Sequence, residues 1–243
     1  MATPVPHNKE YVHHSNPHLG ATIRELVFGM EDGMVSTLGA ITGIAAGSNN
    51  HFIVVLAGLV IISVESISMA VGSYLSSKSE RAIDERKLHE EAHELDVYPE
   101  EEKKELIDMY IRDGWPAPLA ADMAHVASQN KNLFLQEMAF RELQIIPDKM
   151  ERPIQNALVM WFSYIAGGII PLFPYFFFSF DTAVWVSVVI TLIGLFLLGV
   201  GTTTFSKRSW WKAGMEMFIL ASAAAFIGYA VGSIVDTMGM GRF

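Results

Sequence analysis

Four long apolar segments constrain the fold of this chain more than any other feature. Each has close to or above the roughly 20 residues that an α-helix needs to cross a bilayer. They lie at about 53–75, 154–178, 182–205 and 213–235. A fifth segment, 26–47, is interrupted by Glu31 and Asp32 but is uncharged from position 33 to position 48. We therefore predict an all-α membrane protein with five transmembrane helices.

Most of the charge lies between the second and third of these segments. Residues 78–152 contain 18 of the 26 acidic and 11 of the 17 basic residues. This insertion is too long for an ordinary loop. We expect the second span to run on into it without a break, and a new helix to begin at Pro99, a favourable first helical position. Further helices are expected at 116–129 and 132–145.

The sequence therefore divides into four predicted parts. They are a flexible N-terminal tail (1–22), the first two spans (23–77), a cytoplasmic acidic helical domain that binds metal (78–152) and the last three spans (153–243).

Lysine and arginine near the span ends predict the orientation, because cytoplasmic connections are enriched in both. The connections 47–51 and 179–183 contain neither, whereas the N-terminal flank, the acidic domain and 206–212 do. This pattern places the N-terminus and the acidic domain in the cytoplasm and the C-terminus outside. A net charge near −9 argues against nucleic acid as a partner and suits cations. The chain has no cysteine, which excludes thiolate metal sites.

Acidic residues inside the predicted spans need an explanation, because a charge in a bilayer is costly. Asp32 follows Glu31 in the first span, and Glu65 lies in the middle of the second, one turn before Met69. Carboxylate and thioether ligands around a shared cavity suit a transition metal such as Fe²⁺, and the carboxylates could also carry protons. We predict a translocation path lined by Asp32, Glu65 and Met69, with Glu31 as an auxiliary residue. Whether Glu216 is functional or structural is left open.

The acidic domain opens with a motif typical of zinc proteases. His89-Glu90-Glu91-Ala92-His93 matches H-E-x-x-H, but it lies on a charged helix with no strand pattern beside it. A di-iron oxidase would need a second Glu-x-x-His motif, and the domain has none. We therefore expect no enzyme, and we treat His89 and His93 as auxiliary ligands at most.

Paired glutamates give the more informative pattern. Glu91 and Glu94 lie one turn apart before Pro99, and Glu102 and Glu105 repeat the spacing after it. Two antiparallel helices would bring these four carboxylates together, and a divalent cation would relieve their repulsion. Met138 and Glu142 share a face of a later helix, and the adjacent Glu137 is a possible auxiliary ligand. The alternative is a solvated acidic face neutralised by neighbouring lysines.

Glycines in small-x-x-x-small spacing recur in the first span, at Gly29 and Gly33 and again at Gly39, Gly43 and Gly47. This spacing allows close helix contact. The partner is either another helix of the same chain or the same helix of a second copy.

Several segments, in order, carry a resemblance to the vacuolar iron transporter family, and specifically to a prokaryotic-type member. They are "RELVFGMEDGMVSTLGAITGIAAG", "SISMAVGSYLSSKSE", "YPEEEKKELIDMYIRDG", "GGIIPLFPY" and "KAGMEM". The resemblance covers nearly all of the chain from Arg24 onward.

The resemblance implies a homodimeric transporter in a lipid bilayer that exports Fe²⁺, and often Mn²⁺, from the cytoplasm by proton antiport. It implies metal binding in the cytoplasmic domain, with Mn²⁺ or Zn²⁺ as further ions for that site. The implied ligands are Glu91, Glu94, Glu102, Glu105, Met138 and Glu142. In the path it implies Asp32 and Met69. In a prokaryote the host membrane would be the cell membrane.

The chain departs from the family pattern at two positions. Ile61 stands where plant members have a membrane glutamate, with Glu65 one turn later, and Ala139 stands where some members have another metal-binding acid. These departures leave the proton-coupling residue and the number of bound ions open. The rival hypothesis from another class is a membrane-anchored iron-binding, storage or sensing protein.

Overall fold

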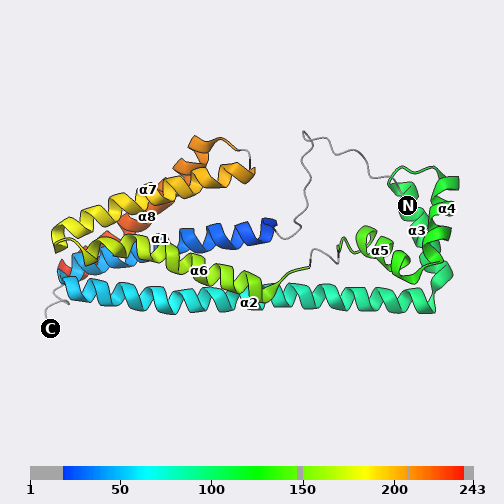
Figure 1. Cartoon of the computed structure of the whole chain (residues 1–243), viewed down its shortest axis with the longest axis horizontal. Coiled ribbons are helices and arrows are strands. Elements are labelled where there is room, and N and C mark those ends of the chain that lie inside the picture. The colour runs from blue at the N-terminus through cyan, green and yellow to red at the C-terminus, as the bar shows by residue number, and fades with distance from the viewer. Residues whose placement is uncertain (1–18, 147–149, 207, 238–243) are drawn as a thin grey trace. The chain divides into compact units, whose positions relative to one another are not determined.

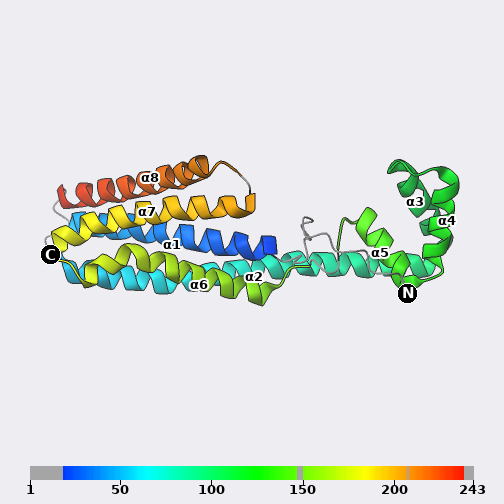
Figure 2. The same ribbon diagram turned by 45° about the horizontal axis from the view of Figure 1, so that its top comes forward.

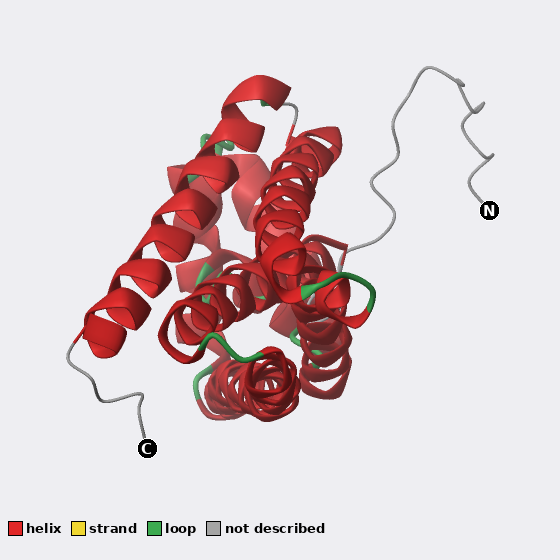
Figure 3. Ribbon diagram, turned by 90° about the vertical axis from the view of Figure 1, so that its left-hand side faces the viewer, coloured by secondary structure: helices red, strands yellow, loops and turns green. Residues whose placement is uncertain are grey.

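The computed structural model of the protein describes residues 19–146, 150–206 and 208–237. Its elements are α1 (Leu19–Ser48), α2 (His51–Val97), α3 (Pro99–Arg112), α4 (Ala117–Ser128), α5 (Lys131–Arg141), α6 (Pro153–Leu172), the 3-10 helix η2 (Phe173–Phe176), α7 (Phe180–Ser206) and α8 (Trp210–Thr237) (Figure 1). Figure 3 shows helices and loops, with no strand among the described residues. The all-α prediction is confirmed for this part of the chain. Most of the predicted tail, residues 1–18, lies outside the described residues.

Four of the described helices are long and apolar enough to cross a membrane. They are His51–Val97, Pro153–Phe176, Phe180–Thr204 and Trp210–Val235. These helices contain the four long apolar segments of the sequence. The fifth predicted span corresponds to α1, which is not among the four because its acidic and small polar residues lower its hydropathy. That α1 crosses the bilayer stays a prediction.

The chain forms two compact units, and α2 contributes to both. Among the described residues, one unit contains 19–20 and 78–152, and the other contains 21–77 and 153–237. We call the first unit the acidic domain; that it is a separate cytoplasmic domain stays a prediction. The second contains the four apolar helices together with α1, and we call it the membrane unit.

The acidic domain is built around a small apolar core. α3, α4 and α5 pack against one another, and Leu95 of α2 completes the core. Its fully or nearly buried members are Leu95, Leu106, Met109, Tyr110, Ala120, Ala124, Ala127, Phe134 and Met138. As expected, α2 continues unbroken to Val97 and α3 starts at Pro99, with three glutamates in its first turn. A helix N-terminus favours this negative charge.

The last helix of the domain is shorter than predicted. α5 ends at Arg141 rather than near 145. Gln144 has a left-handed backbone (φ 56°), and the Ile145 N–H donates to the Ala139 carbonyl at 2.8 Å. The chain therefore turns back on the helix, and the side chain of Ile145 becomes buried.

In the membrane unit, α1 makes backbone-close contacts with two neighbours. A Cβ added to Gly43 would lie 2.7 Å from the Gly228 carbonyl oxygen of α8, and one added to Gly228 would collide with the Gly39 carbonyl oxygen. On another side, Gly33 abuts the Tyr164 carbonyl of α6 in the same way. The glycines of α1 thus have partners within the same chain. Figure 2 shows α1, α7 and α8 running alongside one another in this unit.

Candidate metal cluster and membrane path

Three carboxylates from three parts of the acidic domain meet at one point. Glu91 comes from α2, Glu102 from the first turn of α3, and Glu142 directly follows α5. One ligand oxygen from each lies within 4.8 Å of the other two. This is the only group of three or more histidine and acidic ligands that converges in this way among the described residues. The structure thus joins one member of each predicted pair to the glutamate near α5.

Two of these carboxylates each bury an oxygen that has no hydrogen-bond partner. Glu91 is 2% and Glu102 is 8% exposed, and Glu91 Oε1 and Glu102 Oε2 have no hydrogen-bond partner. A buried acceptor without a donor costs free energy unless a proton or a cation occupies it. Three oxygen donors in this arrangement suit a divalent cation such as Fe²⁺ or Mn²⁺. The residues therefore fit a metal ion.

Burial also determines the protonation of these carboxylates. Burial, together with the charges of Glu142 and Glu102, raises the pKa of Glu91 to about 8. Burial and the charge of Glu105 raise the pKa of Glu102 to about 6, and burial also raises the pKa of Glu142. Without a metal ion, Glu91 therefore keeps a proton near neutral pH. A cation would have to displace that proton.

The other predicted ligands lie around this cluster rather than in it. Glu94 and Glu105 are exposed, and their charges act on the three central carboxylates. Met138 is fully buried among apolar side chains of the domain core, four residues before Glu142. Whether these three residues touch a bound ion stays a prediction.

Glu137, predicted as auxiliary, has other partners. Its Oε2 accepts hydrogen bonds from the Tyr110 hydroxyl at 3.0 Å and from Arg141 Nε at 3.1 Å. Arg141 also pairs with Asp113, and its guanidinium lies 4.4 Å from the centre of the Tyr110 ring. These contacts bind the end of α5 to α3. We call these four residues, Tyr110, Glu137, Arg141 and Asp113, the Arg141 cluster.

The two histidines of the H-E-x-x-H match point elsewhere. His89 and His93 are both exposed, and neither belongs to the converging carboxylate group. Glu90 of the same motif pairs with Arg86 at 3.0 Å on the surface of α2. The motif thus assembles no cluster of its own among the described residues.

In the membrane unit, Glu65 is held by a tyrosine that the sequence analysis did not single out. The Tyr164 hydroxyl of α6 donates to Glu65 Oε2, and the same hydroxyl oxygen lies 2.5 Å from Ser36 Oγ on α1. Tyr164 is fully buried, whereas Glu65 and Ser36 are partly exposed. Asp32 lies one turn before Ser36 and interacts electrostatically with Glu65. Met69 is partly exposed one turn after Glu65.

A second acid of α1 was also missed. Glu25 is 7% exposed, and its Oε2 accepts a hydrogen bond from Ser73 of α2 at 2.7 Å. It lies seven residues before Asp32, so both fall on one face of the helix. The seven-residue spacing between Glu25 and Asp32 is the sequence signal that could have identified Glu25. By contrast, Glu216 forms an exposed ion pair with Arg208 at 2.9 Å, which favours a structural role.

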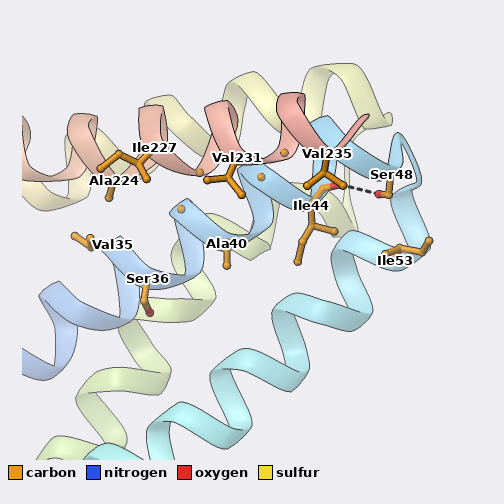
Figure 4. Close-up of a pocket in the computed structure, with 15 residues that line it drawn as sticks. Val35, Ser36, Ala40, Ile44, Ser48, Ile53, Ala224, Ile227, Val231 and Val235 are labelled. Atoms are coloured by element: carbon orange, nitrogen blue, oxygen red, sulfur yellow. Dashed lines mark hydrogen bonds between the residues drawn. The ribbon is translucent and has the colours of Figure 1, made fainter. Parts of the chain in front are cut away.

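An apolar groove of about 860 Å³ runs between α1 and α8 (Figure 4). One wall is α1 from Val35 to Ser48, the other is α8 from Ala224 to Val235, and Ile53 closes one end. Ser36, which contacts Tyr164, is one of its few polar lining residues. Five glycines of the two helices also line it, at positions 39, 43, 47, 228 and 232.

Comparison with known proteins agrees with the sequence resemblance. The model of the VIT family matches residues 23–233. The "Vacuolar iron transporter" of Centaurea cyanus is 30% identical over 229 residues, covering 90% of each chain. "Vacuolar iron transporter 1" of Arabidopsis thaliana is 30% identical over 220 residues, covering 88% of each chain. The "Vacuolar iron transporter" of Toxoplasma gondii is 27% identical, covering 88% of this chain and 74% of that protein.

Proposed function

Because the chain belongs to the VIT family, we propose that it is a transporter that carries Fe²⁺ out of the cytoplasm across a lipid bilayer. Members of this family are transporters and not enzymes. In this proposal Mn²⁺ is a second cargo, since oxygen ligands accept both ions. Protons move in the opposite direction, and in a prokaryote the host is the cell membrane. The N-terminus and the acidic domain face the cytoplasm, with the C-terminus outside.

The observation that carries the proposal is the convergence of Glu91, Glu102 and Glu142. The buried, unpartnered oxygens of Glu91 and Glu102, with the exposed carboxylate of Glu142 beside them, supply a reason for a divalent cation to bind in the acidic domain. We assign to this domain the capture of the ion from the cytoplasm. Glu94, Glu105 and Met138 are its further proposed ligands. Zn²⁺ would compete for the same site, because carboxylates bind it as well.

Asp32, Glu65 and Met69 are the proposed path, with Glu31 beside it. This path is supported by two carboxylates of the membrane unit, Asp32 and Glu65, which lie on adjacent helices and interact electrostatically. Such groups are expensive in a bilayer and mark ion routes. Proton exchange follows from the same carboxylates, because a cation and protons compete for them.

Transport into proteoliposomes tests the proposal. The purified protein should carry Fe²⁺ under reducing conditions, faster with an imposed proton gradient, and Asp32→Ala should lose most of the flux. Equal flux through the parent and Asp32→Ala would exclude Asp32 from the path. No flux through any preparation that binds Fe²⁺ would favour the rival function, a membrane-anchored iron-binding, storage or sensing protein. The metal cluster alone would serve that rival equally well.

A homodimer is part of the proposal. It is supported by the groove between α1 and α8, which is apolar and open at the surface of the membrane unit. The chain has no cysteine, so single introduced cysteines report contacts without background. Ala40→Cys in the groove should crosslink two copies in membranes, whereas Gly201→Cys, at an uncrowded position on α7, is the control. Crosslinking of neither variant, with a monomeric mass in nanodiscs, would refute the dimer.

A further inference from the structure

The hydrogen bonds around Tyr164 have a fixed direction. A carboxylate only accepts hydrogen bonds, so the Tyr164 hydroxyl donates to Glu65 Oε2. Ser36 Oγ lies 2.5 Å from the Tyr164 oxygen. Because the only proton of the Tyr164 hydroxyl is already used, the Ser36 hydroxyl must donate to Tyr164. The chain of bonds therefore runs from Ser36 through Tyr164 to Glu65.

This direction decides what each residue offers to its surroundings. The single hydroxyl hydrogen of Ser36 is already donated to Tyr164. The Ser36 oxygen therefore offers only lone pairs to the groove that Ser36 lines. Glu65 has one oxygen bound to Tyr164, so its other oxygen is left for a further partner. Both residues are partly exposed, whereas Tyr164 is fully buried behind them. The result is two acceptor oxygens, from α1 and α2, that are joined through one hydroxyl of α6.

We propose that Tyr164 is a positioning residue, which holds the Glu65 carboxylate and orients the Ser36 hydroxyl so that both present acceptor oxygens to the transported cation. The inference rests on the proposed function and extends the path to Ser36, as an oxygen ligand on α1 one turn from Asp32. A cation needs acceptors only, and a free serine or a mobile glutamate would have to be reoriented on each passage.

The three residues come from three different helices, Ser36 from α1, Glu65 from α2 and Tyr164 from α6. Tyr164 itself lies 99 residues from Glu65 and 128 from Ser36, so only helix packing joins the three.

Tyr164→Phe removes the hydroxyl and leaves the ring, and Tyr175→Phe removes a hydroxyl from another buried tyrosine as the matched control. In proteoliposomes Tyr164→Phe should raise the KM for Fe²⁺ about tenfold with a smaller change in Vmax, as for a lost hydrogen bond to a charged group. Tyr175→Phe should keep the parent KM. In a Glu65→Gln background the same Tyr164→Phe change should have a clearly smaller effect, because the part of its effect that acts through the Glu65 carboxylate is already lost.

Two results would overturn the inference: equal KM values for Tyr164→Phe and Tyr175→Phe, or full additivity of Tyr164→Phe and Glu65→Gln. A binding measurement keeps this test separate from the proposed function. In a variant with Glu91, Glu102 and Glu142 changed to glutamine, Mn²⁺ binding followed by electron paramagnetic resonance should weaken about tenfold with Tyr164→Phe. If the parent transports no ion but this weakening occurs, the proposed function fails and the positioning role stands. If the parent transports and no weakening occurs, only the positioning role fails.

Discussion

Glu91 of α2 and Glu102 of α3 each bury a carboxylate oxygen that has no hydrogen-bond partner, and both residues have an oxygen within 4.8 Å of an oxygen of a third carboxylate, Glu142. The two residues are separated by a helix break at Pro99, which folds α3 back toward α2. Two buried carboxylates at this distance destabilise a protein when both are charged, unless a proton or a cation neutralises one of them. Most of the expected behaviour of the acidic domain follows from this relationship.

Removing one of these carboxylates should weaken divalent metal binding strongly. We expect Glu102→Gln to lower the affinity for Mn²⁺ by a factor of about ten or more, because a charged ligand becomes neutral. Titration calorimetry on the purified protein in detergent measures this. His93→Ala is the control from the H-E-x-x-H match, since the side chain of His93 is exposed and outside the group. If His93→Ala lowered the affinity for Mn²⁺ more than Glu102→Gln did, the histidine motif would belong to the metal site.

Without metal, the stability of the protein should fall as the pH rises. The pKa of Glu91 is about 8 in the folded protein against an ordinary value of 4.5. The folded state therefore binds the extra proton, and this stabilisation is complete below about pH 4.5 and lost as the pH rises toward about 8. The apparent Tm in a chelator should be lower at about pH 8 than at about pH 6, and Mn²⁺ should restore it. Glu91→Gln should flatten this pH dependence; an unchanged slope would contradict the assignment to Glu91.

The Arg141 cluster should contribute to stability rather than to metal binding. Glu137→Gln weakens two hydrogen bonds that tie α5 to α3, so we expect a loss of about 1 kcal/mol in the free energy of unfolding. Metal affinity should change by less than about twofold, because Glu137 is engaged by Tyr110 and Arg141. Denaturant unfolding and calorimetry of the same variant separate the two effects. A tenfold loss of affinity with unchanged stability would make Glu137 a ligand after all.

Close packing of α1 against α8 should tolerate no added methyl group. Gly228→Ala would push a Cβ into the Gly39 carbonyl oxygen, and we expect a cost of about 1–3 kcal/mol, seen as a lower apparent Tm. Gly201→Ala is the matched control, because nothing lies within 4 Å of its added Cβ. In that helical position alanine should be neutral or stabilising. Equal Tm values for the two variants would mean that α1 and α8 are less closely packed than described.

Patterns within single segments were enough to predict the helices. Runs of about 20 apolar residues predict membrane helices because the thickness of a bilayer sets their length. Pro99 marks the start of α3 because proline fits the first turn and not the interior. The end of α5 was predicted wrongly, since its reversal depends on Ile145 finding a buried position, which is a tertiary contact.

The spacing of residues along one helix indicated which acids share a face, but not which faces meet. That is why the paired glutamates were identified from the sequence, while the cluster joins Glu91 and Glu102 to Glu142 and leaves Glu94 and Glu105 at its edge. For the same reason no pattern in the sequence predicted the hydrogen bond between Tyr164 and Glu65. Helix rotation and crossing are set by packing over the whole bundle, here by glycine contacts such as that between Gly33 and Tyr164. Side chains distant in sequence meet only after those contacts have formed.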